Sequence, residues 1–266
     1  MPSVDAMSDY SLHGFGSGPV LALAHGAGGG IEANFAELAA HLPGRTLTGR
    51  DYPGSGSRPP AATPLTLAGL ADELVEAQLR AGNDRFPILG LSLGTTVAIT
   101  AAARHPERVS GLILTVGMAE IDVQGANFAT LFADLARAER WHDLARVMLL
   151  SVGTPAQLAT LDADAAARAI AATVADLQVG GSALIPQMEL VRTVDVRREA
   201  AAIGVPTLVI GAGQDRTVLP SSTRRLAELI PGAEYVELPE AGHIFTPAET
   251  PTWAAQISAF LAKHRL

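Results

Sequence analysis

The sequence contains no cysteine, and aromatic residues make up only 5% of its 266 residues. The absence of cysteine excludes disulfides, thiolate nucleophiles and cysteine-ligated zinc sites. Acidic residues outnumber basic ones by 27 to 19, and no basic block or stripe occurs. We therefore expect neither nucleic acid nor a membrane surface as a partner. No His-Glu-x-x-His run or similar ligand cluster is present, so we also expect no metal.

Long apolar runs and a leader pattern are missing as well. No stretch reaches about 18 uninterrupted apolar residues, the length of a membrane-spanning helix. Residues 1–11 lack a basic segment followed by an apolar run, which is the pattern of a secretory signal. We therefore expect a cytoplasmic protein that acts on a small molecule, as a monomer or homodimer. The chain is still 48% hydrophobic, which is enough for the buried core of one large domain.

Short apolar runs alternate with longer amphipathic stretches along most of the chain. The runs predict strands, and the stretches between them predict helices. The predicted strands lie at 20–24, 45–48, 87–91, 109–116, 205–211 and 234–238, and the predicted helices at 65–80, 92–104, 221–229 and 252–264. This alternation predicts an α/β fold, with a mostly parallel sheet and helices on both faces. In such sheets, ligands bind beyond the carboxyl ends of the strands.

Residues 118–194 break the alternation, because they show helical patterns and no convincing strand. We interpret them as a helical cap or lid, inserted into a core formed by residues 1–117 and 195–266. A second independent domain is the alternative, which the shortness of the segment and the lack of a Pro/Gly-rich linker disfavour. Phe128, Trp141 and Met188 lie in this segment and predict an apolar substrate pocket, although such residues more often belong to an ordinary core.

The strongest chemical motif is Gly90-Leu91-Ser92-Leu93-Gly94, which lies between a predicted strand and a predicted helix. This is the context of a nucleophile elbow, a strained turn that needs small residues two positions to either side of the serine. The elbow lifts the hydroxyl above the sheet and points the helix N-terminus at a developing oxyanion. Ser92 is therefore the predicted nucleophile. The alternative is a serine helix cap with turn glycines nearby.

A glycine-rich turn at residues 25–30 follows the first predicted strand. Such a turn leaves backbone N–H groups free to face a substrate, and Gly26 and Gly28 are the predicted contacts. Acyl transfer needs two donors about 3 Å from the oxyanion position. The predicted donors are the amides of Ala27 and Leu93. A dinucleotide or phosphate-binding loop is disfavoured, because the last glycine of the first pattern and the lysine of the second are missing.

His243 and Asp215 are the predicted partners of Ser92. His243 follows the last predicted strand, where it is placed to reach the elbow, and a solvated loop histidine is the alternative. Asp215 follows a buried strand and can accept a hydrogen bond from the histidine, which fixes the tautomer of the ring. An ordinary turn aspartate is the alternative for this residue, and Glu120 or Asp122 is the rival acid.

These motifs together resemble the α/β-hydrolase superfamily, specifically its members with a helical cap. The matching segments, in the order typical of the family, are 25–29, 51–57, 90–94, 211–215 and 242–243. The resemblance implies the α/β-hydrolase fold, a triad of Ser92, His243 and Asp215, and no cofactor. We expect His25 to brace its turn and the 51–57 loop to shape the floor of the site. Leu91 stands where many thioesterases and lipases of the superfamily carry histidine, which weakens those two readings.

The predicted reaction is hydrolysis of an ester, lactone or thioester in a small to medium, largely apolar substrate. His243 removes the proton of Ser92, Ser92 attacks the carbonyl, and water resolves the acyl-enzyme. The same triad can serve carbon–carbon bond hydrolysis, aminopeptidase or lyase chemistry, because a fold does not fix its reaction. A ligand-binding, receptor-like protein with little turnover is a further alternative.

Overall fold

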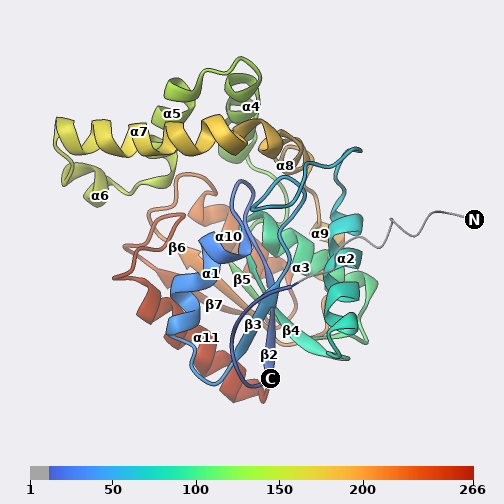
Figure 1. Ribbon diagram of the computed structural model, residues 1–266. Helices are drawn as coiled ribbons and strands as arrows, with labels where there is room; N and C mark the ends of the chain where they lie inside the picture. Colours follow the sequence, from blue (N-terminus) through green and yellow to red (C-terminus); the bar gives the residue numbers. More distant parts are fainter. Residues whose placement is uncertain (1–11) are drawn as a thin grey trace, which may run out of the picture.

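The computed structural model describes residues 12–266, and a seven-stranded sheet forms its centre (Figure 1). The strand order is β1-β3-β2-β4-β5-β6-β7. β1 pairs antiparallel with β3, and all the other pairs are parallel. The strands are β1 (His13–Gly16), β2 (Val20–Ala24), β3 (Thr46–Gly49), β4 (Phe86–Leu91), β5 (Val109–Thr115), β6 (Thr207–Ala212) and β7 (Glu234–Leu238). The predicted mostly parallel sheet is confirmed, and β1 is an addition to it.

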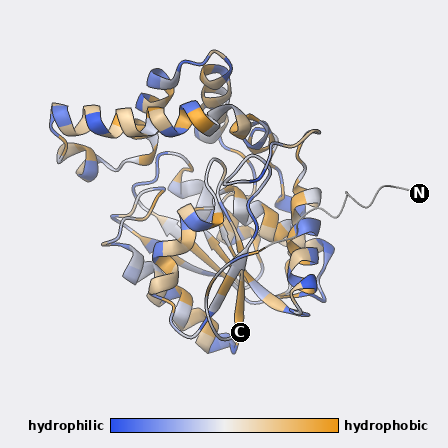
Figure 2. Cartoon of the chain, in the orientation of Figure 1, coloured by the Kyte–Doolittle hydropathy of each residue, from blue (hydrophilic) through white to orange (hydrophobic). Residues whose placement is uncertain are grey.

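The central strands are buried on both faces. All six residues of β4 and β6 are buried, whereas the edge strand β7 is half-buried along most of its length. Helices cover both faces of a parallel sheet, so its central strands read as continuous apolar runs. Figure 2 shows hydrophobic residues along these central strands. This burial is why the sequence pattern located the central strands.

Two apolar clusters lie on the two faces of the sheet. One contains residues of α2 (Leu67–Arg80), α3 (Leu93–Arg104), α9 (Arg197–Ala201) and α10 (Pro220–Leu229), and the other contains residues of α1 (Ile31–Ala40) and α11 (Thr250–His264). Successive side chains of a strand point to opposite faces. Accordingly, Ala22 and Ala24 of β2 belong to the first cluster, and Leu21 and Leu23 to the second.

Residues 118–194 are helical, as the sequence predicts. Their elements are α4 (Val123–Arg137), α5 (Trp141–Val152), α6 (Pro155–Ala159), α7 (Ala163–Gly180), a short 3₁₀ turn η2 (Gly181–Leu184) and α8 (Ile185–Val191). Asp122, Thr154 and Asp162 each accept a backbone N–H at the start of a helix, which explains where α4, α6 and α7 begin. α5 packs on α7 and α4 packs on α8. In Figure 1 these helices lie together at one end of the sheet.

The two ends of this helical segment lie side by side. Glu120 and Asp195 form an isolated antiparallel bridge. Beside it, the N–H of Val196 donates to the carbonyl oxygen of Ala119 at 2.7 Å. The chain therefore leaves the sheet after β5 and returns to it before β6 at one point.

In the part of the chain that the structure describes, one helical stretch, Ala163–Val191, is long and apolar enough to cross a membrane by length and composition alone. The sequence analysis did not single it out, because charged residues such as Asp164 and Arg168 interrupt its apolar run. The stretch comprises α7, η2 and α8, and 17% of its apolar window is buried inside the fold.

Candidate active site

Ser92 lies in the turn between β4 and α3 with φ 53° and ψ −118°, a conformation that side chains rarely adopt. The flanking glycines are required by space. A Cβ on Gly90 would lie 2.5 Å from the carbonyl oxygen of Gly94, and a Cβ on Gly94 would lie 1.9 Å from that of Ala24. Backbone strain of this kind clusters at functional sites. The strained strand-to-helix turn predicted from the sequence is therefore present.

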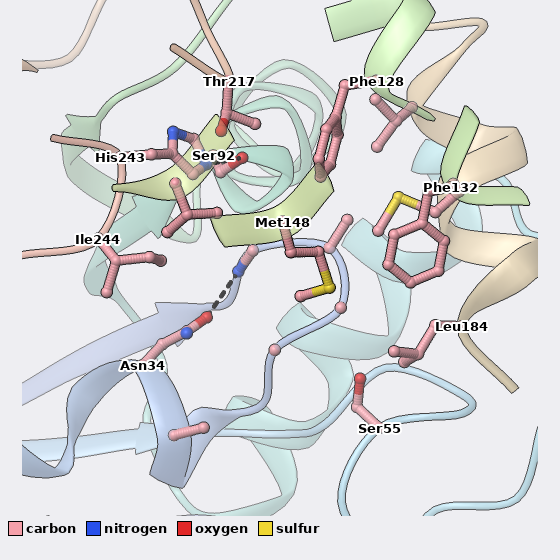
Figure 3. A pocket seen from close by; sticks show the side chains of 18 of the residues that line it. Asn34, Ser55, Ser92, Phe128, Phe132, Met148, Leu184, Thr217, His243 and Ile244 are labelled. Atoms are coloured by element: carbon pink, nitrogen blue, oxygen red, sulfur yellow. Dashed lines mark hydrogen bonds between the residues drawn. The ribbon is translucent and has the colours of Figure 1, made fainter. Parts of the chain in front are cut away.

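The structure brings Ser92, His243 and Asp215 together, although they lie on three different loops. The Oγ of Ser92 is 3.1 Å from Nε2 of His243, and Nδ1 of His243 is 2.7 Å from Oδ2 of Asp215. Oδ1 of Asp215 accepts the N–H groups of Thr217 at 2.7 Å and Val218 at 2.9 Å. These two donors fix the carboxylate, so its other oxygen faces Nδ1–H and leaves Nε2 free to accept from the serine. Figure 3 shows Ser92 and His243 facing each other at the cavity.

The rival carboxylates are engaged elsewhere. Asp122 accepts a hydrogen bond from the hydroxyl of Ser222 at 2.6 Å. Glu120 forms an ion pair with Arg197 at 2.7 Å. Asp215 is 4% exposed and is the carboxylate that contacts the histidine. The geometry therefore favours Asp215 among the three acids that the sequence left open.

The glycine-rich turn after β2 is closed by a hydrogen bond of 3.1 Å from the N–H of Gly29 to the carbonyl oxygen of Gly26. Gly28 has φ +76°, as the third residue of a type II turn requires. The same Gly26 oxygen accepts from Nδ1 of His25 at 2.8 Å. In a trans peptide, N–H and C=O point in opposite directions. The N–H of Ala27 therefore points away from these two donors.

Leu93, the other predicted oxyanion donor, is the first residue of α3. Its N–H is one of the first-turn groups that have no partner within a helix. The side chain is fully buried, while the backbone follows Ser92 directly. The position therefore leaves this N–H available beside Ser92.

His25 is fully buried and braces the glycine-rich turn, as predicted. Its Nε2 accepts the N–H of Tyr52 at 2.8 Å, and its ring lies 3.9 Å from the Tyr52 ring, centroid to centroid. Because Nε2 is an acceptor, the single ring proton is on Nδ1, which donates to Gly26. Burial lowers the pKa of His25 from 6.5 to about 4, so the ring is neutral at pH 7.

A cavity of about 500 Å³ opens onto Ser92 and His243. Its wall is mainly apolar, and Figure 3 shows Phe128, Phe132 and Met148 among the side chains that line it. Four of the predicted substrate contacts line it, namely Gly26, Gly28, Phe128 and Met188. Within residues 12–266, no group of three or more His, Asp and Glu side chains is arranged to hold a metal ion.

Comparison with known proteins identifies the family of the chain. Residues 19–247 match the family model described as the alpha/beta hydrolase fold, which covers most of the chain. The chain belongs to the α/β-hydrolase family.

Several relatives of this α/β hydrolase are enzymes. It is 33% identical over 242 residues to pyrrolizixenacetamide deacetylase of Xenorhabdus hominickii, and the aligned region covers 90% of this chain and 89% of that protein. It is 30% identical over 240 residues to a putative carbamate hydrolase, RutD, of Klebsiella pneumoniae, which covers 88% of each. The enol-lactonase of Burkholderia xenovorans LB400 has a TM-score of 0.81 and 25% identity, covering 95% of this chain and 96% of that one. The protein is therefore a hydrolase.

Trp141 is the one predicted pocket residue of the α/β hydrolase that does not line the cavity. It begins α5, and its ring lies against Gly181, where an added Cβ would be 2.8 Å from Cζ3 of the ring. The indole therefore packs between helices of the segment 118–194. The sequence placed Trp141 on a helix, but the rotation of that helix decides which residues face the cavity.

Two polar residues that the sequence analysis missed contact the glycine-rich turn. Oδ1 of Asn34 accepts the N–H of Gly26 at 3.0 Å, the bond drawn in Figure 3. Oε1 of Gln187 accepts the N–H of Gly28, also at 3.0 Å. Asn34 lies only eight residues after Gly26, so its proximity was a usable signal. Gln187 is 159 residues away from Gly28 and has no local signal.

Proposed function

We propose that this α/β hydrolase is a serine hydrolase that cleaves an ester, lactone or thioester bond in a small to medium, largely apolar substrate. The observation that carries the proposal is the hydrogen-bonded series Ser92, His243 and Asp215 at an apolar cavity. In this assignment Ser92 is the nucleophile, His243 the base and Asp215 the residue that orients the base.

The proposed reaction proceeds through these atoms. Nε2 of His243 takes the proton from Oγ of Ser92 as Oγ attacks the carbonyl carbon. The negative charge then develops on the carbonyl oxygen, where the N–H groups of Ala27 and Leu93 are the proposed donors. The protonated histidine passes its proton to the leaving group, and Asp215 stabilises the imidazolium meanwhile. Water, activated by the same nitrogen, then attacks the acyl-enzyme and frees the serine.

The cavity supports an apolar substrate. Helices of the segment 118–194 contribute Phe128, Met148 and Leu184 to its wall, and we propose that this segment serves as the cap. Apolar groups of a substrate gain about 25 cal/mol for each Å² that they remove from water. Exclusion of water also strengthens the charge–dipole interactions on which the oxyanion donors depend.

A second candidate is hydrolysis of a small amide or carbamate. Two relatives favour it, because one is named a deacetylase of an acetamide and the other a putative carbamate hydrolase. The same residues serve this reaction, since His243 can protonate a departing amine. Matched pairs of acetyl ester and acetamide substrates separate the two candidates by their kcat/KM values.

The deciding experiment is intact-protein mass spectrometry after exposure to a fluorophosphonate that reacts with activated serines. We expect one adduct on Ser92, absent in Ser92→Ala and slower to form in His243→Ala. Melting temperatures of both variants close to that of the wild type would show that the fold is kept. Absence of an adduct on the folded wild type would overturn the proposed mechanism and favour a binding protein.

A further inference from the structure

Gln187 is a fully buried polar residue in α8, and its side-chain amide forms three hydrogen bonds. Oε1 accepts the N–H of Gly28 at 3.0 Å. Nε2 donates to the carbonyl oxygen of Pro53 at 3.1 Å and to Oγ of Ser55 at 2.9 Å. One side chain thus joins the segment 118–194 to two loops of the sheet that lie 132 to 159 residues away in sequence.

Packing alone does not explain an amide at this position. The neighbouring residues of α8 (Met188, Leu190 and Val191) are buried and apolar. A buried amide loses its bonds to water, and it is tolerated only where the fold replaces them. Methionine has a similar length and would fill the same space without that requirement. The groups that the amide of Gln187 binds therefore account for a polar residue at this position.

The bond to Gly28 acts on the central peptide of the glycine-rich turn. That peptide, between Ala27 and Gly28, is the unit that reverses when a turn changes between types I and II. The first peptide of the turn is held by the core, because the carbonyl oxygen of Gly26 accepts from His25, and the last peptide is held by the bond from the N–H of Gly29 to the same oxygen. The central peptide is held by α8 through Gln187.

The loops and the helical segment are also in close contact around this residue. A Cβ on Gly54 would lie 2.2 Å from the carbonyl oxygen of Ala183 in η2. A Cβ on Gly28 would lie 3.3 Å from Cε of Met188. A small displacement of α8 therefore separates Gln187 from its partners in both loops.

We propose that Gln187 is a positioning residue that couples the placement of α8 to the conformation of the glycine-rich turn. His25 fixes the peptide that carries the N–H of Ala27, and Gln187 keeps the next peptide in the type II orientation, so the turn is held on both sides of Ala27 only when α8 is seated on residues 28 and 53–55. This inference rests on the proposed serine-hydrolase function, for which the turn supplies one oxyanion donor. It makes the segment 118–194 part of transition-state stabilisation as well as part of the cavity wall.

The first test replaces Gln187 by methionine, with Glu189→Gln as the matched control. Glu189 lies in the same helix but forms ion pairs on the surface with Arg192, at 2.8 Å, and with Arg137 of α4, away from the cavity. With a short-chain ester, we expect Gln187→Met to lower kcat at least tenfold and to change KM less than threefold. Affinity for a boronic acid, which forms a tetrahedral adduct on the serine, falls by the same factor as kcat/KM. Glu189→Gln keeps both values within twofold of the wild type.

A second readout does not depend on activity. We expect amide hydrogen exchange in the peptides that cover residues 25–36 to become at least tenfold faster in Gln187→Met than in Glu189→Gln. Unchanged exchange there, or an equal effect of the two variants on kcat, would overturn the coupling. If the wild type neither hydrolyses esters nor reacts with a fluorophosphonate, the proposed function fails, while the exchange comparison still decides the coupling.

In a third variant, Gln187→Glu, the pH controls how far the hydrogen bonds of the amide are restored. When protonated, the introduced carboxyl can accept from Gly28 and donate to Ser55, as the amide does. Burial disfavours the charged form and raises the pKa of such a carboxyl. We expect the ratio of variant to wild-type kcat to rise as pH falls from 8 to 5.5. A flat ratio would contradict the proposal, and this comparison decides alone if Gln187→Met does not fold.

Discussion

The hydrogen bond from Nδ1 of His25 to the carbonyl oxygen of Gly26 orients the peptide that carries the N–H of Ala27. It depends on a second bond, because the N–H of Tyr52 occupies Nε2 of the same ring. A second ring proton would bind to Nε2 and break that hydrogen bond. The glycine-rich turn is therefore built on a histidine that stays neutral.

This arrangement predicts how stability depends on pH. Burial lowers the pKa of His25 to about 4, below the 6.5 of the unfolded chain, so the unfolded state binds more protons between these values. The contribution of neutral His25 to the free energy of unfolding is fully present above pH 6.5 and is lost as pH falls towards 4. The difference between the two pKa values corresponds to about 3 kcal/mol. Urea unfolding at pH 7.5 and pH 4.5 should show a larger loss in the wild type than in His25→Gln. Equal losses would mean that His25 is protonated in the folded state.

Asp215→Asn tests the orientation of the base. The amide oxygen can still accept from Thr217 and Val218, which leaves the NH2 group facing Nδ1 of His243. The ring must then carry its proton on Nε2, where it cannot accept the proton of the serine. We expect kcat to fall by about 10⁴, as in other triads with this change, with little change in melting temperature. The control is Asp122→Asn, which we expect to retain activity, and a loss of less than tenfold in Asp215→Asn would contradict the assignment.

Gly94→Ala tests the close packing behind the nucleophile. The added Cβ would meet the carbonyl oxygen of Ala24 at 1.9 Å, so β2 and α3 must move apart. We expect the free energy of unfolding to fall by about 3 kcal/mol, at the upper end for overpacked sites. Gly204→Ala is the matched control, because its Cβ meets nothing within 4 Å. Its unfolding free energy should change by less than about 0.5 kcal/mol. Similar urea midpoints for the two variants would contradict the steric explanation.

Met148→Trp tests the size of the cavity. Met148 lines the wall from α5 and is drawn among the lining side chains in Figure 3. An indole would fill part of the space, so we expect KM for a hexanoyl ester to rise at least tenfold and KM for an acetyl ester to change less than threefold. Leu150→Trp, on an exposed position of the same helix, should leave both values unchanged. An equal effect on the two esters would show that the acyl chain binds elsewhere.

The sequence located elements that carry their own signals. The bounds of β2 and β7 agree with the predicted strands to the residue. β1 was missed because its four residues, His-Gly-Phe-Gly, form an exposed edge strand with two glycines and no apolar run. α1 was missed because no local side chain caps it. Its first N–H, from Ile31, donates instead to Asp51 at 2.7 Å, a partner 20 residues away.

The candidate site also contains residues with a local sequence signal and residues without one. Ser92 stands in a motif whose glycines are required by local sterics, and His243 and Asp215 follow strands with clear patterns. The roles of Trp141 and Gln187 depend instead on how the helices of residues 118–194 are rotated and seated. A single sequence carries the apolar pattern of those helices, but it does not carry their packing against loops more than 100 residues away.

Because Glu120 and Asp195 form a bridge, the helical segment between them could be replaced by another insert without moving the strands on either side. Its two ends already meet, so a longer or shorter insert changes the entropy of loop closure only slowly. The strands that carry Ser92 and Asp215 lie outside residues 118–194. A different insert could therefore alter the substrate range and leave the positions of these two residues unchanged. By the coupling proposed for Gln187, a working replacement would have to present one acceptor to the N–H of Gly28.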